Sequence, residues 1–418
     1  MGLQSVDERF GPARGFVADG FEGVAKTFAR QLQSGAQLGA GFAVYRKGEC
    51  VVDLWGGLAD TKSGRPWERD TRLVLFSVTK GFAAMALHLL ADRGLLEWGA
   101  PVAQYWPGFA KAGKGGITVA TLLGHRGGLA YLDTKMTLAD YMDPAKADFV
   151  RDALENQVPE WTPGTDQGYH AITFGMYARE LFERIAGEDM GGFLRRELFE
   201  PLGSDVRLGT PASEDGRFAT LYPPPTGERV ANMVGRAVTE PTSMEARVFR
   251  AVLDSKSTAR RAFVNPSIPK NDLTAYNREP IRRSVLAWGS ATGSAHGVAR
   301  SYLPFAARGV FGGKVYLEAE TIAPAYRRTG WSDLDRVLQK PVGWTNGFLK
   351  EERHIFCPNP ESFGHAGMGG SLGWCDPVEE LTLGYAMNKM DWRIRSLRAL
   401  ELCRALYDCE AMAAPRMV

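Results

Sequence analysis

Strand patterns occupy both ends of this 418-residue chain, and helical patterns fill its middle. Residues 41–45 and 50–57 lie on either side of the short polar turn at residues 46–49, which predicts a β-hairpin. From Ser77 to about residue 300 the apolar spacing is mostly helical. The last third predicts three antiparallel strands and a closing helix, at residues 342–348, 364–373, 381–387 and 392–407. This order of elements predicts one sheet assembled from the two termini around a helical insert.

The expected fold class is therefore α+β, with an antiparallel sheet flanked by helices plus a mainly helical domain. Residues 1–76 and 335–418 are expected to form the discontinuous sheet domain, and residues 77–334 the helical domain, with the active site at their interface. With 44% hydrophobic and 23% charged residues, the composition is that of an ordinary globular protein. Such a chain can bury a deep site.

Charge and cysteine usage argue against several functional classes. The 50 basic and 48 acidic residues nearly balance, and no dense basic stripe suggests nucleic-acid binding. The five cysteines are widely spaced and contain no CxxC, which argues against a disulfide framework or a zinc site. Residues 1–14 lack the apolar segment of a signal peptide, and no stretch reaches membrane-spanning length. We expect a cytoplasmic protein with reduced thiols and no membrane partner.

The segment Ser77 to Lys80, with sequence Ser-Val-Thr-Lys, lies where a buried run gives way to a helix. Side chains three residues apart on a helix meet, so the Lys80 amine can accept or relay the proton of the Ser77 hydroxyl. Backbone N–H groups of the first helical turn are unpaired and can stabilise a developing anion. The alternative is a helix-capping serine beside a solvated lysine. A second copy, Ser267 to Lys270, is interrupted by proline and predicts a loop without chemistry.

Two further segments could complete a site around Ser77. Tyr169 follows a Pro/Gly turn and leads into an apolar helix, and its phenol becomes a useful base only beside a cation such as Lys80. The glycine-rich run Gly364 to Gly370 has a strand context in which a ligand could approach backbone N–H groups. Alternatively, Tyr169 is a packing residue and the run is a bulged core strand with a satisfied histidine.

One rival nucleophile is Ser371, because Gly369 to Gly373 matches the GxSxG elbow of α/β-hydrolases. That fold places its histidine after the serine, whereas the last histidine of this chain is His365. The elbow interpretation therefore fails on chain order. The remaining histidines have no metal-binding spacing, so neither a metal nor an organic cofactor is expected.

Three motifs in this order resemble those of the serine β-lactamase and penicillin-binding-protein superfamily: Ser77 to Lys80, Tyr169 to Ala171, and His365 to Gly367. They are most similar to the class C β-lactamase-like esterases called family VIII carboxylesterases. Two segments after the nucleophile helix are also similar to this family, residues 94–102 and 117–129. The resemblance covers about residues 15 to 410 and implies the fold of that superfamily.

The resemblance implies roles for individual residues. Ser77 would be the acylated nucleophile, and Lys80 and Tyr169 would share the proton transfer. Backbone N–H groups of Ser77 and Met368 would form the oxyanion hole. The remaining substrate-binding residues would be His365 and Gly367, with Trp344 a candidate pocket wall.

Two departures from the class C pattern bear on substrate choice. Ala171 replaces an asparagine that would orient a β-lactam side chain, and His365 replaces a lysine that would bind a substrate carboxylate. Both changes favour a neutral ester. We expect hydrolysis of short-chain carboxylic esters, with acyl transfer or amide or β-lactam cleavage as alternatives, and a non-catalytic acyl-ligand sensor as a remote one. The partner is then a small-molecule ester, and the sequence leaves the oligomeric state open.

Overall fold

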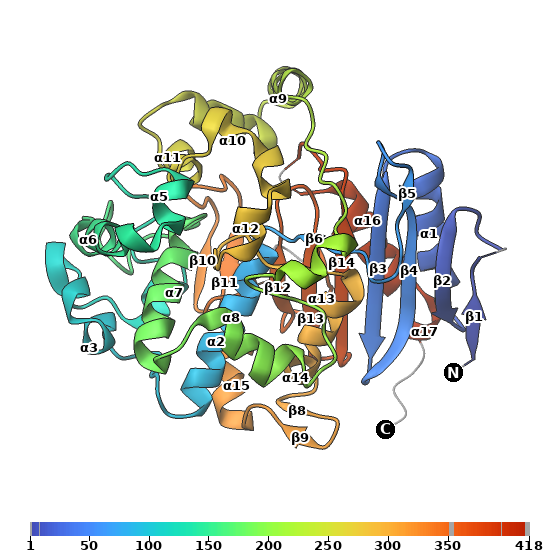
Figure 1. The fold of residues 1–418 in the computed structure, drawn as a ribbon, viewed down its shortest axis with the longest axis horizontal. Coiled ribbons are helices and arrows are strands. Elements are labelled where there is room, and N and C mark those ends of the chain that lie inside the picture. Colours follow the sequence, from blue (N-terminus) through green and yellow to red (C-terminus); the bar gives the residue numbers. More distant parts are fainter. Residues whose placement is uncertain (1, 8, 351–354, 394, 414–418) are drawn as a thin grey trace.

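A computed structural model describes residues 2–7, 9–350, 355–393 and 395–413 (Figure 1). Its centre is an eight-stranded antiparallel sheet in the order β1-β2-β4-β3-β14-β13-β12, with β5 paired to β4. Its strands are β1 (Leu3–Ser5), β2 (Ala13–Ala18), β3 (Gly39–Arg46), β4 (Glu49–Asp60), β5 (Arg65–Pro66), β12 (Phe363–Ala366), β13 (Leu372–Asp376) and β14 (Leu381–Met387). β3 pairs with β14, so the two ends of the chain share one sheet as predicted.

The predicted hairpin is confirmed as β3 and β4. Its turn places Lys47 at φ 51° and Gly48 at φ 80°, and two consecutive positive φ angles match the right-handed twist of the flanking strands. Phe42 and Val44 belong to one apolar cluster, while Ala43 and Tyr45 belong to another. Because successive strand residues point to opposite faces, the sheet is covered on both sides.

Helices from the two termini cover one face of the sheet, and the helical insert covers the other. α1 (Glu22–Gln33) packs on α16 (Leu397–Tyr407) and contacts β2 and β4. On the opposite face, α13 (Ala295–Ser301) contacts β3 and β14, and α2 (Val78–Asp92) contacts β12 and β13. Figure 1 shows α3 (Val102–Tyr105), α5 (Leu138–Met142), α6 (Ala147–Asn156) and α7 (Thr173–Ala186) on the side of α2 away from the N-terminal strands.

The insert and its surroundings consist of short elements. The helices are α3 (Val102–Tyr105), α4 (Val119–Leu123), α5 (Leu138–Met142), α6 (Ala147–Asn156), α7 (Thr173–Ala186), α8 (Met190–Leu194), α9 (Thr226–Thr239), α10 (Met244–Leu253), α11 (Thr258–Val264), α12 (Glu279–Arg283), α14 (Leu303–Ala306), α15 (Ala319–Tyr326) and α17 (Glu410–Ala413). Three two-stranded sheets join β6 (Leu73–Val74) to β7 (Thr292–Gly293), β8 (Val310–Phe311) to β9 (Lys314–Val315), and β10 (Gly330–Ser332) to β11 (Val342–Trp344). In the part of the chain that the structure describes, no helix has the length and apolarity needed to cross a membrane.

The helix that follows Ser77 is central to the insert. Every residue of α2 from Val78 to Leu90 is buried, and the chain leaves the helix at Gly94, which has φ 70°. The second copy of the motif is a loop, as predicted. There, Lys270 is exposed at φ 56° within the short 3₁₀ turn Pro269–Asn271, and a cis peptide bond joins Asn265 to Pro266 just before the motif.

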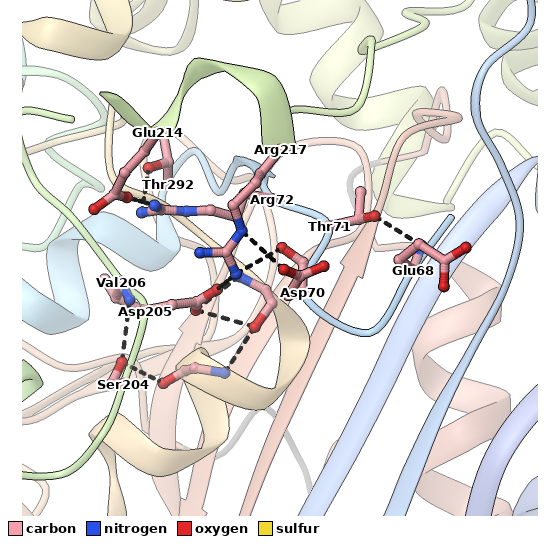
Figure 2. A network of polar contacts seen from close by, with 12 residues as sticks. Glu68, Asp70, Thr71, Arg72, Ser204, Asp205, Val206, Glu214, Arg217 and Thr292 are labelled. Carbon is pink, nitrogen blue, oxygen red and sulfur yellow. Dashed lines mark hydrogen bonds and ion pairs between the residues drawn. The ribbon is translucent and has the colours of Figure 1, made fainter. Parts of the chain in front are cut away.

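A buried arginine holds the strand that precedes the nucleophile (Figure 2). Arg72 is fully buried, forms an ion pair with Glu214, and donates from Nη2 to Thr292 Oγ1 at 3.2 Å. Its backbone N–H donates to Arg217 O at 2.9 Å, and its carbonyl accepts from Ala219 N at 2.8 Å. Hydrogen bonds and an ion pair of Arg72 therefore hold the chain segment before Ser77 against β7 and residues 214–219.

Three predicted elements need correction. Residues 342–348 do not form one strand: β11 ends at Trp344 and pairs with β10, the chain turns at Gly347, φ 93°, and Leu349 then bridges to Trp344 and to Gly364 of β12. Residues 364–373 form two strands, not one. Gly369 and Gly370 have φ 85° and 130°, which reverses the chain between β12 and β13. The closing helix begins at Leu397 instead of Trp392. The proposed domain boundaries stay a prediction.

Candidate active site

Ser77 occupies the N-cap position of α2, where α2 leaves the short strand β6. The preceding residue, Phe76, has φ 48°, a conformation that bulky residues rarely adopt. Its buried ring packs against Tyr276, with centroids 4.8 Å apart. Ser77 itself is half-buried, so its hydroxyl is accessible at the end of a rigid segment.

Two polar side chains converge on the Ser77 hydroxyl. Lys80 Nζ donates to Ser77 Oγ at 3.0 Å, and the Tyr169 hydroxyl donates to the same oxygen at 2.9 Å. Lys80 Nζ also donates to the Trp288 carbonyl at 3.0 Å. Lys80 is fully buried, and this burial holds its pKa well below the usual value of a lysine. A lysine with so low a pKa can present a neutral amine, whose lone pair accepts a proton.

Tyr169 is held from both its backbone and its ring. Its backbone N–H donates to Asp335 Oδ1 at 3.0 Å. Its ring stacks on Trp344 with centroids 5.4 Å apart and an interplanar angle of 2°. The predicted pocket residue Trp344 therefore lies in the site, where it supports the phenol from a buried position.

His365 lies beside this aromatic pair. Its ring centroid is 6.0 Å from that of Tyr169 and 5.9 Å from that of Trp344. Its Nδ1 is 2.9 Å from the Ala366 carbonyl, and only 2% of the residue is exposed. The structure thus brings His365 to the site, in a position shielded from solvent.

The turn between β12 and β13 carries the predicted oxyanion donor. Gly367 N donates to Ser371 O at 2.7 Å, and a side chain at Gly367 would collide with Ser371 Oγ and the Leu75 carbonyl. Within the described residues, neither the Met368 nor the Ser77 backbone N–H donates to a protein acceptor. Both N–H groups are therefore available to a ligand oxygen. The Met368 side chain is 40% exposed.

Ser371, the rival nucleophile, is buried and hydrogen-bonded to the backbone. Ser371 is 1% exposed, and its hydroxyl donates to the Leu75 carbonyl at 2.9 Å. This bond links the start of β13 to the residue two positions before Ser77. The serine of the GxSxG match is thus part of the support of the site.

Three residues around the site were not predicted from the sequence. His125 is buried against Tyr169 and Trp344, with centroids 5.2 and 4.0 Å away, and its Nδ1 accepts from His170 N at 3.0 Å. Burial, together with neighbouring His170, His365 and Lys80, holds the pKa of His125 well below its usual value. His125 lies in the family-like segment 117–129, which was a signal for it. No sequence motif marks Asp335 or Trp288. Asp335 accepts a hydrogen bond from the backbone of Tyr169, and Trp288 contributes only its backbone carbonyl.

Comparisons with known proteins identify the family of this chain. The β-lactamase family profile matches residues 24–403. The esterase/β-lactamase LipL of Mycobacterium tuberculosis is 30% identical over 377 residues, covering 88% of this chain and 81% of LipL. A solved family VIII carboxylesterase has a TM-score of 0.83 at 34% identity, with 95% of this chain and 99% of that chain covered. A penicillin-binding-protein homologue from Caulobacter crescentus has a TM-score of 0.80 at 31% identity, with 95% and 99% covered.

The chain therefore belongs to the β-lactamase family. This membership confirms the predicted class, a serine hydrolase of the β-lactamase superfamily similar to family VIII carboxylesterases. It also confirms the predicted α+β fold.

Proposed function

We propose that the protein is a serine esterase that hydrolyses short-chain carboxylic esters through an acyl-Ser77 intermediate. The observation that carries the proposal is the convergence of Lys80 Nζ and the Tyr169 hydroxyl on Ser77 Oγ, at 3.0 and 2.9 Å. Nucleophile and base within hydrogen-bond reach are what covalent catalysis requires. The family VIII carboxylesterase that the chain resembles supports an ester as the substrate.

Acylation would begin with attack of Ser77 Oγ on the ester carbonyl. The Ser77 proton passes to the Lys80/Tyr169 pair, which then protonates the departing alcohol oxygen. We assign this proton transfer to the pair jointly. The negative charge on the carbonyl oxygen would be met by the N–H groups of Ser77 and Met368, each contributing about 3 kcal/mol to lowering the barrier.

Deacylation would use the same groups in reverse. Water takes the place of the alcohol, loses its proton to the Lys80/Tyr169 pair, and attacks the acyl carbonyl. Ser77 Oγ then leaves and is reprotonated by the pair. These steps use only side chains and backbone groups of this chain, and we propose that neither a cofactor nor a metal takes part.

Two features support a neutral ester over an anionic antibiotic. Ala171 is a buried methyl group and offers no amide to a β-lactam side chain. His365 is shielded and weaker than lysine as a partner for a substrate carboxylate. The name of LipL, an esterase/β-lactamase, supports β-lactam hydrolysis as the second candidate activity. Acyl transfer to an alcohol would need the same acyl-enzyme.

We also propose a cytoplasmic location and a small-molecule ester as the partner. All five cysteines are free thiols, four of them buried, as suits a reducing compartment.

Intact-protein mass spectrometry during incubation with p-nitrophenyl butyrate, and separately with a cephalosporin, tests the proposal. Wild type should show an acyl adduct or fast release of p-nitrophenol, with little cephalosporin hydrolysis. Ser77→Ala should show neither, whereas Ser267→Ala, in the second copy of the motif, should behave as wild type. Most activity remaining in Ser77→Ala would disprove the assignment. An adduct that is never released would indicate a sensor instead.

A further inference from the structure

Three potential metal ligands meet outside the Ser77 site. Cys50 and Asp53 lie on β4, and His296 lies on α13. Their thiol, carboxylate and imidazole donor atoms all lie within 4.8 Å of one another. Among the residues that the structure describes, this is the one group of three such side chains at that spacing. We propose that it binds one divalent transition-metal ion, with Zn²⁺ the ion that its donors favour.

A β-bulge brings the two strand residues to the same face. Residues three apart on a regular strand point to opposite faces, because side chains alternate. Here Asp53 is opposite Ala43 and Cys50 is opposite Tyr45, with the register shifting by one residue between Val44 and Tyr45. The extra residue on β4 turns both ligands toward α13. Bulges commonly re-aim a side chain in this way.

The donor set suits zinc better than the hard cations. Zn²⁺ is bound by thiolate, imidazole and carboxylate, whereas Mg²⁺ and Ca²⁺ take oxygen ligands. Three protein ligands leave a fourth tetrahedral position for water. Cys50 and His296 are partly exposed, so the ion can enter, while Asp53 is buried. Tyr45 OH lies 3.1 to 3.2 Å from the His296 ring nitrogens and can orient the imidazole from outside the ligand set.

Arg69 supplies the positive charge of this cluster in the metal-free protein. Its Nε donates to Asp53 Oδ2 at 2.6 Å, and its Nη2 is 3.3 Å from His296 Nδ1. The side chain is half-exposed and can turn into solvent. A second arginine, Arg300, donates from Nη1 to Tyr45 OH at 3.4 Å. Metal binding therefore exchanges the Arg69 guanidinium for the ion as the partner of Asp53.

Binding needs no oxidant or reductant. A bond forms between Cys50 Sγ and the ion, and the thiol proton leaves to solvent. The ion would tie β4 to α13, and so the central sheet to the helical insert. The cluster shares no residue with the Ser77 site, so the expected consequence is stability and not ester turnover.

The test uses the full-length protein, free of affinity tag, after chelator treatment and dialysis. Titration calorimetry with ZnCl₂ should show one equivalent bound to wild type and none to Cys50→Ala or His296→Ala. Cys409→Ala, which removes a buried thiol elsewhere, should bind as wild type does. Arg69→Ala should bind about two- to fivefold more tightly, because the competing cation is gone. With CoCl₂, thiolate-to-cobalt charge-transfer absorption should appear in wild type and be absent in Cys50→Ala.

Circular dichroism of Cys50→Ala keeps the result interpretable, since a native spectrum excludes misfolding as the cause of lost binding. Should Cys50→Ala misfold, Arg69→Ala and the cobalt spectrum of wild type decide. Absence of binding in wild type, or binding that persists in folded Cys50→Ala and His296→Ala, would overturn the proposal. Hydrolysis of p-nitrophenyl butyrate should be the same with and without chelator, so failure here is distinct from failure of the esterase assignment.

Discussion

The backbone N–H of Tyr169 donates a hydrogen bond of 3.0 Å to the carboxylate of Asp335, 166 residues further along the chain. The same carboxylate oxygen accepts from Val337 N and Leu338 N, each at 2.9 Å. Asp335 is fully buried and therefore has no solvent to replace any of these bonds. The position of the phenol beside Ser77 thus depends on a residue distant in sequence that does not touch the reacting atoms.

Asp335→Ala should weaken both the fold and the site. Three buried N–H groups would lose their acceptor, which should lower the free energy of unfolding by about 3 kcal/mol, measured by urea denaturation. Tyr169 would be displaced, so kcat for p-nitrophenyl butyrate should fall. Asp335→Asn keeps an acceptor oxygen and is the matched control.

The comparison of Asp335→Ala with Asp335→Asn also depends on the charge of Asp335, because burial raises the pKa of this carboxyl. The Asp335 carboxyl stabilises the fold fully at pH values below its pKa in the unfolded chain. This stabilisation is lost as the pH rises through its pKa in the folded protein. At neutral pH, Asp335→Asn should therefore be far less destabilised than Asp335→Ala. Equal losses in the two variants would contradict the role given to the acceptor oxygen.

Lys80→Met should abolish the proton acceptor while keeping an apolar stem in the buried site. We expect kcat/KM to fall about 10²- to 10⁴-fold, the usual contribution of a general base. Lys270→Met, in the second copy of the motif, is exposed and should leave activity unchanged. Near-wild-type turnover by Lys80→Met would exclude Lys80 from the proton transfer.

The same variant predicts a pH dependence of stability. Burial lowers the pKa of Lys80, so between its folded pKa and 10.5 the unfolded chain binds one more proton than the folded protein. The free energy of unfolding of wild type, relative to Lys80→Met, should therefore rise with pH across this window, by about 1.4 kcal/mol per pH unit. This gain in the free energy of unfolding should be lost as the pH falls toward the pKa of Lys80 in the folded protein. A difference independent of pH would mean that Lys80 is charged in the folded protein.

Tyr169→Phe should separate packing from chemistry. The ring keeps its stacking on Trp344, while the hydroxyl that donates to Ser77 Oγ is lost. We expect kcat to fall about 10²-fold or more with little change in thermal stability. If the phenol also activates water, intact-mass measurements should show more acyl-enzyme than in wild type. Tyr105→Phe, whose hydroxyl accepts from Glu97 N, serves as the control and should turn over normally.

Gly367→Ala should disturb the oxyanion donor while leaving the side chains of Ser77, Lys80 and Tyr169 unchanged. The added methyl group would collide with Ser371 Oγ and the Leu75 carbonyl, so the turn that carries Met368 N must shift. Loss of one donor costs about 10²- to 10³-fold in kcat. Gly116→Ala has open space around its Cβ and should be neutral. Normal kinetics in Gly367→Ala would place the oxyanion hole elsewhere.

The features that could be predicted from the sequence depend on local chemistry. The β3–β4 hairpin, helix α2 after Ser77, and the meeting of Ser77 with Lys80 all depend on residues close in the chain, where backbone periodicity sets the geometry. The three motifs in order were also enough to predict the family. The turn at Gly369 and Gly370 was missed because glycines fit both a bulged strand and a reversal of the chain, and their φ angles decide between them.

The distant groups that support these residues became visible only in the folded protein. Asp335 and the Trp288 carbonyl reach Tyr169 and Lys80 through contacts that leave no motif, because any residue type supplies the backbone half of the bond. Likewise, Cys50 and Asp53 share a face only because β4 carries a bulge opposite β3. Such contacts depend on how the sheet and the helical insert pack, and packing is a property of the whole chain and not of any local pattern.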